Sequence, residues 1–114
     1  MTVGVLYSKL RTGFVTGSSV EYKGSITIDE NIMDDLGIVE WQECDVNSRD
    51  GFRGTTYVLK GKRGTGCVEA NGALASHVFK GDIVHINFYA QMSMEAAKEW
   101  SPIIVESNKP YMKK

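Results

Sequence analysis

The 114-residue chain has few of the residues that cross-link a fold or ligate metals, with two cysteines and two histidines, and it has two prolines. Cys44 and Cys67 form no CxxC pair, so we expect two isolated, reduced thiols rather than a disulfide. His77 and His85 lack a partner set for metal ligation, so we expect structural or surface histidines and no metal site.

Charge of one sign and long apolar runs are also missing. The net charge is −1 and there is no polybasic run, which argues against nucleic acid and membrane surfaces as partners. No apolar run approaches the length of a membrane span, and the N-terminus lacks a signal-peptide pattern. These absences predict a cytoplasmic location.

The sequence does contain 12 glycines, which separate short apolar runs. The clearest run covers residues 83–92, where apolar side chains at every second position predict a strand with one buried face. The length allows one domain over residues 1–114. Many short strands, frequent glycine turns and a few short helices predict an all-β barrel or sandwich, and composition does not choose between them.

The other elements are predicted from alternation, capping residues and turn residues. Asp29 is a good N-cap for a helix that reaches Leu36, and Gly37 suits its end, while Ser93 can cap a helix over residues 94–100. We expect a polar, loose tail over residues 107–114. The expected strands cover residues 2–10, 20–23, 26–28, 44–47, 54–59, 67–69 and 103–105, with turns at 12–13, 16–19, 49–51 and 60–64 and one or two helical turns at 73–77.

The central feature is the Gly24-Ser25 step between two of these strands. We expect glycine to allow a backbone conformation that a Cβ would forbid, and to leave its carbonyl carbon open to attack. The Ser25 hydroxyl can then shift the acyl group from nitrogen to oxygen. β-Elimination of the ester and hydrolysis would leave a pyruvoyl group on residue 25. Most Gly-Ser steps are plain turns, so this chemistry needs further support.

That support is a resemblance over about residues 6–92 to the pyruvoyl-dependent aspartate 1-decarboxylase family. Besides Gly24-Ser25, the matching residues are Arg53, Thr56-Tyr57, Arg63-Gly64, Asn71-Gly72-Ala73 and Lys80-Gly81-Asp82-Ile83-Val84. The resemblance implies a six-stranded double-psi β-barrel, assembled as a homotetramer with active sites between subunits. It also implies self-cleavage into residues 1–24, the β chain, and 25–114, the α chain, with a possible maturation factor.

The implied activity is the decarboxylation of L-aspartate to β-alanine and CO2, as a supply for pantothenate synthesis. The cofactor would be the pyruvoyl group made from Ser25, which forms a Schiff base with the substrate, so neither a metal nor pyridoxal phosphate is expected. By resemblance, Arg53 binds the substrate's side-chain carboxylate, Tyr57 donates the proton to Cα, and Thr56 assists cleavage.

The remaining pocket residues are implied in the same way. Asn71, Gly72 and Ala73 match the loop that faces the pyruvoyl group, and Lys9 and Tyr22 match positions that line the pocket. Without the resemblance, Arg53 would be taken for a solvated arginine, and the others for ordinary strand or turn residues.

Two positions depart from the family pattern. Arg11 stands where histidine is common, and Leu74 replaces a second small alanine after Asn-Gly-Ala, which would narrow the pocket or redirect its loop. A related acidic amino acid is therefore an alternative substrate.

A β-barrel that never cleaves and serves in binding or regulation is a second alternative. A hydrolase with Ser25 as its nucleophile lacks a convincing base.

Overall fold

The computed structural model describes residues 1–21 and 24–112. Eight strands account for most of the regular structure, with two short α-helices and two 3-10 turns. In chain order the elements are β1 (Thr2–Phe14), β2 (Gly17–Ser19), β3 (Ser25–Asp29), α1 (Glu30–Leu36), β4 (Glu43–Ser48), β5 (Arg53–Gly61), β6 (Val68–Asn71), η1 (Gly72–Ser76), β7 (Ile83–Ser93), α2 (Met94–Glu99), β8 (Ile103–Ser107) and η2 (Lys109–Tyr111).

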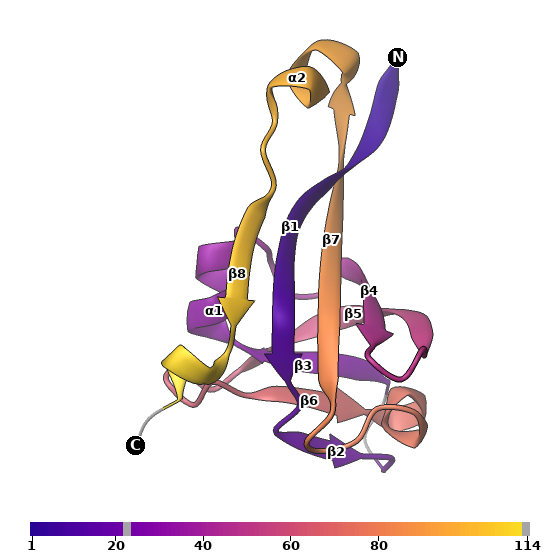
Figure 1. The fold of residues 1–114 in the computed structure, drawn as a ribbon, viewed down its shortest axis with the longest axis vertical. Coiled ribbons are helices and arrows are strands. Elements are labelled where there is room, and N and C mark those ends of the chain that lie inside the picture. Colours follow the sequence, from indigo (N-terminus) through magenta and orange to yellow (C-terminus); the bar gives the residue numbers. More distant parts are fainter. Residues whose placement is uncertain (22–23, 113–114) are drawn as a thin grey trace.

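All eight strands belong to one sheet with the order β2-β6-β3-β5-β4-β7-β1-β8. In Figure 1, β1, β7 and β8 run along the long axis of the molecule, and β3 and β6 cross beneath them at a steep angle. The N-terminus and α2 lie together at the far end of the long strands. The strongly curved sheet confirms the prediction of an all-β, barrel-like fold.

The core fills the space that the curved sheet encloses. Alternate residues of β7 point inward, so Val84, Ile86 and Phe88 are fully buried, as the period-two pattern predicts. Ile26 on β3 pairs with Val58 on the parallel strand β5, and both side chains are fully buried. Burying this apolar surface stabilises the fold by about 25 cal/mol per Å² removed from water.

The ends of α1 follow the predicted capping pattern. The Asp29 carboxylate accepts a hydrogen bond from the backbone N–H of Asn31 at 2.8 Å, and Gly37 takes the left-handed conformation at φ 69°. Asp29 is fully buried, and its other carboxylate oxygen accepts from the N–H groups of Gly64 and Gly66. This residue therefore joins the end of β3 to the loop between β5 and β6.

Two predicted turns and the first half of one predicted strand, between residues 12 and 21, are wrong. Thr12 and Gly13 lie in β1, which continues to Phe14 after a register shift against β7 between Leu10 and Gly13. Residues 17–19 form β2 rather than a turn, because Gly17 to Ser19 pair in parallel with β6. Val20 and Glu21 form a turn rather than a strand, and the rest of that predicted strand lies outside the described residues.

The C-terminal segment is docked as far as Met112, so the prediction of a loose tail is wrong over the part that the structure describes. Asn108 is fully buried: its amide nitrogen donates to the carbonyls of Phe14 and Gly66, and its oxygen accepts from the N–H of Phe14. Tyr111 donates its hydroxyl hydrogen to Asp35 on α1. This polar segment was predicted to be loose because its hydrogen-bond partners are distant along the chain and cannot be recognised from the local sequence.

Replacing Asn108 by alanine should lower the free energy of unfolding by about 2–4 kcal/mol, because three backbone groups, all at least partly buried, lose their partner. Urea denaturation followed by circular dichroism measures the change. Glu106→Ala is the control: it removes an exposed ion pair with Arg11 and should cost less than about 1 kcal/mol. Equal, small losses in both variants would contradict the anchoring role of Asn108.

Candidate active site

Ser25 is the first residue of β3 and is fully buried. The side-chain amide of Asn71, at the end of β6, donates to Ser25 Oγ at 3.0 Å and to Thr27 Oγ1 at 2.8 Å. These contacts follow from the antiparallel register of β3 and β6, in which Ser25 lies opposite Asn71. The bond from Asn71 fixes the position of the serine oxygen without using its hydroxyl hydrogen.

A hollow of about 370 Å³ opens beside Ser25. Its walls come from the Gly24-Ser25 step, from the turn and first half of β5, and from η1. The lining includes Thr56, Tyr57, Ala73 and Leu74 among the residues singled out in the sequence. The complete set of described lining residues is Gly24, Ser25, Phe52, Gly54, Thr55, Thr56, Tyr57, Ala73, Leu74 and His77.

The conformational argument for Gly24 stays a prediction. Among the described residues, a Cβ built on Gly24 would meet nothing within 4 Å beyond its chain neighbours. The open space supports the other half of the expectation, that the peptide between Gly24 and Ser25 is accessible from one side.

Tyr57 and Thr56 enter the hollow from β5. The parallel register that pairs Ile26 with Val58 brings the preceding residues of the two strands to the same end of the sheet. The ring of Tyr57 also packs against Trp41, with centroids 5.7 Å apart. This packing limits the orientations that the phenol can take.

Trp41 is a site residue that the sequence reasoning missed. It has a φ of 76° and is 67% exposed, an unusual combination for a bulky side chain. A tryptophan in a short connection between a helix and a strand was the available signal. Its significance depends on the contact with Tyr57, which only the folded chain shows.

Arg53 and Lys9 do not line the Ser25 hollow within one chain. Arg53 is exposed at the start of β5 and borders a separate hollow of about 180 Å³ with Asp45 and Asn47. The two hollows share Gly54 and Thr55 as a common wall.

Lys9 lies on β1, where it pairs with Asn87 and Ile104. Burial lowers the pKa of His85 on the neighbouring strand, and the positive charges of Lys9, Arg49 and Arg11 lower it further. Lys9 and Arg11 are thus two of the positive charges that act on His85, and Arg11 also forms an ion pair with Glu106.

Asn71, Gly72 and Ala73 form the junction between β6 and η1. Gly72 has a φ of 63°, a conformation that glycine adopts at little cost. The turn directs Ala73 and Leu74 into the wall of the hollow. Leu74 is 8% exposed, so the departure from the family pattern places a large apolar side chain beside Ser25. The prediction for Tyr22 lies outside the described residues.

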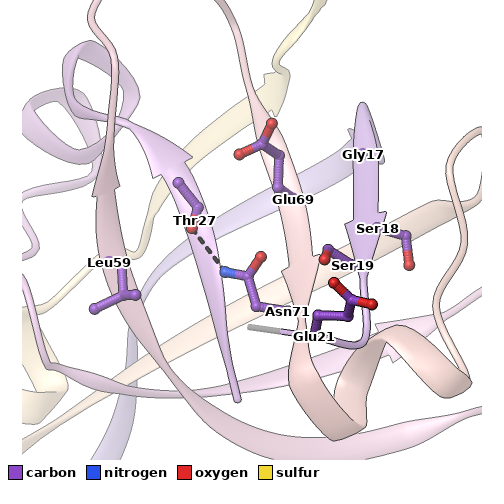
Figure 2. A pocket seen from close by; sticks show the side chains of 8 residues that line it. All are labelled: Gly17, Ser18, Ser19, Glu21, Thr27, Leu59, Glu69 and Asn71. Atoms are coloured by element: carbon purple, nitrogen blue, oxygen red, sulfur yellow. Dashed lines mark hydrogen bonds between the residues drawn. The ribbon is translucent and has the colours of Figure 1, made fainter. Parts of the chain in front are cut away.

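A larger hollow of about 680 Å³ lies on the other side of Asn71. Figure 2 shows its lining, with the Asn71 amide pointing to Thr27 and the carboxylates of Glu21 and Glu69 nearby. Two carboxylates would repel an acidic substrate. The smaller hollow with Ser25 is therefore the better candidate for the site, despite its size.

Other kinds of site find little support. Among residues 1–21 and 24–112, no group of three or more histidine, cysteine or acidic side chains could hold a metal. Both cysteines are free thiols, and burial raises the pKa of Cys44 to about 12, which suits a packing role rather than a nucleophile. No helix in the described part of the chain is long and apolar enough to cross a membrane.

The fold and the site define a class: an all-β, barrel-like protein with a buried serine, held by an asparagine, directly after an accessible glycine peptide. Comparison with known proteins makes the assignment specific. The model of the aspartate decarboxylase family matches residues 1–111. The chain belongs to this family.

Individual relatives agree with that assignment. The chain is 44% identical over 106 residues to a protein named Aspartate 1-decarboxylase from Phocaeicola vulgatus, covering 92% of this chain and 91% of the relative. It is 43% identical over 109 residues to a protein of the same name from Campylobacter hominis, covering 95% and 94%. The matches span nearly the full length of both relatives, so the resemblance noted in the sequence is confirmed.

Proposed function

We propose that this protein is a self-processing decarboxylase that converts L-aspartate to β-alanine and CO2. The observation that carries the proposal is the buried Ser25 hydroxyl, held by Asn71 at a hollow next to the Gly24 peptide. Membership of the aspartate decarboxylase family and relatives named Aspartate 1-decarboxylase support the reaction and the substrate.

Processing begins with Ser25 Oγ attacking the Gly24 carbonyl carbon. A C–O bond forms, the C–N bond breaks, and residue 25 gains a free amine. Removal of its Hα and loss of Oγ with the Gly24 carboxylate leave a dehydroalanine. Hydration and loss of ammonia then give a pyruvoyl group at the start of 25–114 and a carboxylate at the end of 1–24. Thr56 lines the same hollow, where its hydroxyl would stabilise the oxyanion on Gly24.

The residues around Ser25 fit the pyruvoyl group, because the hollow is open at this position and is lined by the hydroxyl groups of Thr56 and Tyr57. This group supplies a conjugated carbonyl that takes up the electrons left at Cα when CO2 departs. Tyr57, oriented by Trp41, would donate the proton to Cα. The walls around Ser25 would keep the departing carboxylate poorly solvated.

Arg53 would bind the side-chain carboxylate of the substrate with its two-pronged guanidinium. Within one chain, Arg53 borders a separate hollow, and Lys9 lies on β1, where it pairs with β7. We propose that association of copies completes the site, with a homotetramer as the expected state. Sedimentation equilibrium tests this, and a monomer with full activity would contradict it.

Whether a maturation factor assists cleavage is tested by measuring the rate of cleavage with purified protein alone.

The direct test of function is to incubate processed protein with a panel of acidic amino acids, measuring released CO2 and the product amine. We expect L-aspartate to yield β-alanine. Intact mass measured on the same material separates two outcomes. An uncut chain without turnover would favour a binding or regulatory barrel, whereas a cut chain that is inactive on aspartate would favour another acidic substrate.

Leu74 bears on which acidic amino acid is accepted, because it narrows the hollow that Ser25 lines. Leu74→Ala should shift the ratio of kcat/KM values between aspartate and larger acidic analogues by about tenfold toward the larger ones, the scale of a few methylene groups in a pocket. It should also cost about 2–3 kcal/mol of stability. Val78→Ala, a buried control outside the hollow, should cost stability without changing the ratio. An unchanged ratio in Leu74→Ala would remove Leu74 from substrate selection.

A further inference from the structure

An aromatic stack between two separate elements forms part of the wall around Ser25. Phe52 precedes β5 and His77 follows η1, and both line the hollow. Their ring centroids are 4.8 Å apart and their planes differ by 8°, so the imidazole lies flat against the phenyl ring. Residues 25 positions apart are thereby brought together at the candidate active site.

The phenyl ring has a defined position. The backbone N–H of Phe52 donates to Ser48 Oγ at 3.1 Å, and the carbonyl of Phe52 accepts from the N–H of Ser48 at 2.8 Å. The ring covers Gly54, where a Cβ would lie only 2.7 Å from a ring carbon. The absence of a side chain at Gly54 is what allows Phe52 to fold over β5 and meet His77.

The charges around the hollow give the stack its significance. Of the described lining residues, Tyr57 and His77 are the titratable ones, and His77 is the one that can carry a positive charge. Phe52, Ala73 and Leu74 cannot donate through their side chains, and the other side-chain donors of the lining are the neutral hydroxyls of Ser25, Thr55, Thr56 and Tyr57. His77 is exposed at the edge of the hollow, where its imidazole is the side chain that can offer a carboxylate a charge-assisted hydrogen bond.

We propose that His77 is a substrate-recognition residue, whose imidazole donates a hydrogen bond to a carboxylate of the bound acidic substrate. Stacking on Phe52 fixes the plane of the ring, so its N–H groups point from the ring edge instead of lying against the phenyl face. An imidazole carries at least one N–H in either protonation state. The inference rests on the proposed function for the class of ligand, and it assigns a recognition group within the same chain as Ser25.

The test uses the wild-type protein as purified, with ring-labelled histidine and succinate as a dicarboxylate that cannot be decarboxylated through an α-amine. The chain has two histidines, and His85 on β7 serves as an internal control. In NMR spectra, the His77 ring resonances should shift saturably with succinate while those of His85 stay in place. Unmoved His77 resonances at concentrations that occupy the site by calorimetry would overturn the proposal.

Two variants make the test independent of any single substitution. His77→Leu should weaken succinate binding about tenfold or more, and His77→Gln, which keeps an N–H donor, should lose less. Wild-type affinity in a folded His77→Leu protein would overturn the proposal. Succinate binding at His77 without turnover of any amino acid would sink the proposed function and leave this inference standing. Normal turnover with unmoved His77 resonances would overturn this inference alone.

Discussion

Ser25→Ala should leave the protein as one uncut chain with no decarboxylase activity. Alanine has no hydroxyl to attack the Gly24 carbonyl, so neither the ester nor the pyruvoyl group can form. The wild type should separate into fragments 1–24 and 25–114, the second lighter by one ammonia than a fragment that starts with serine. Intact-mass spectrometry after prolonged incubation measures both species, and a hydrazine probe detects the ketone.

The matched control is Ser76→Ala, which removes an exposed hydroxyl from η1 near the same hollow. It should cleave and turn over at wild-type rates. Asn71→Ala offers a graded intermediate: loss of the bond to Ser25 Oγ should slow cleavage by about tenfold or more, a value typical of one lost hydrogen bond. Cleavage between residues 24 and 25 in the Ser25→Ala chain would end the proposed mechanism.

Arg53→Ala should cleave normally yet lose substrate binding. Arg53 does not line the Ser25 hollow within the chain, so its removal leaves the processing residues in place. Removing one partner of a desolvated ion pair costs about 2–4 kcal/mol, which is roughly a 30- to 700-fold loss in kcat/KM. Steady-state kinetics with L-aspartate, beside intact mass for processing, measures the two effects separately.

Arg63→Ala is the control for charge. Arg63 forms exposed ion pairs with Glu30 and Asp34, away from the hollow, so its loss should change kcat/KM less than about twofold. Should Arg53→Ala and Arg63→Ala behave alike, the carboxylate clamp has to be sought elsewhere, and His77 becomes the leading residue for that role.

These two experiments also test what the comparisons leave open. Family membership supports the reaction, while the roles of Ser25, Arg53, Thr56 and Tyr57 stay predictions until variants are measured. The structure supports these proposed roles to different degrees, according to how close each residue lies to Ser25. Ser25 and Asn71 are already in hydrogen-bond contact, and Tyr57 and Thr56 share the hollow with Ser25. Arg53 and Lys9 do not line that hollow within one chain, so their proposed roles depend on the proposed association of copies.

Local patterns predicted the parts of the fold that depend on local physics. The alternation in β7 requires one face to be buried, and Asp29 and Gly37 satisfy the unpaired backbone groups at the ends of α1. Both predictions are confirmed: the caps contact residues within a few positions, and the alternation of β7 is a local pattern although its partners on β1 and β4 are distant. The family resemblance is confirmed as well, since the short motifs that carry it can be recognised in one sequence.

Tertiary pairing decided the remainder. Gly13 and Ser18 looked like turn residues, yet strands β7 and β6 provide hydrogen-bond partners that outweigh local preference. Asn108 was predicted to lie in a loose polar tail, but its side chain is hydrogen-bonded to the backbone of Phe14 and Gly66. In each case the deciding partner lies more than 40 positions away in the sequence, beyond the reach of any local pattern.

The amino acids alone predicted an all-β member of this family, which is confirmed, because strand alternation and short motifs can be recognised within a few neighbouring residues. The reactivity of the Gly24-Ser25 step stays a prediction. Folding decided which side chains surround that step: Asn71 against Ser25, Trp41 against Tyr57, and Phe52 beneath His77. The physical reason is that a pocket is made of residues from several strands, and their meeting depends on the register and curvature of the whole sheet.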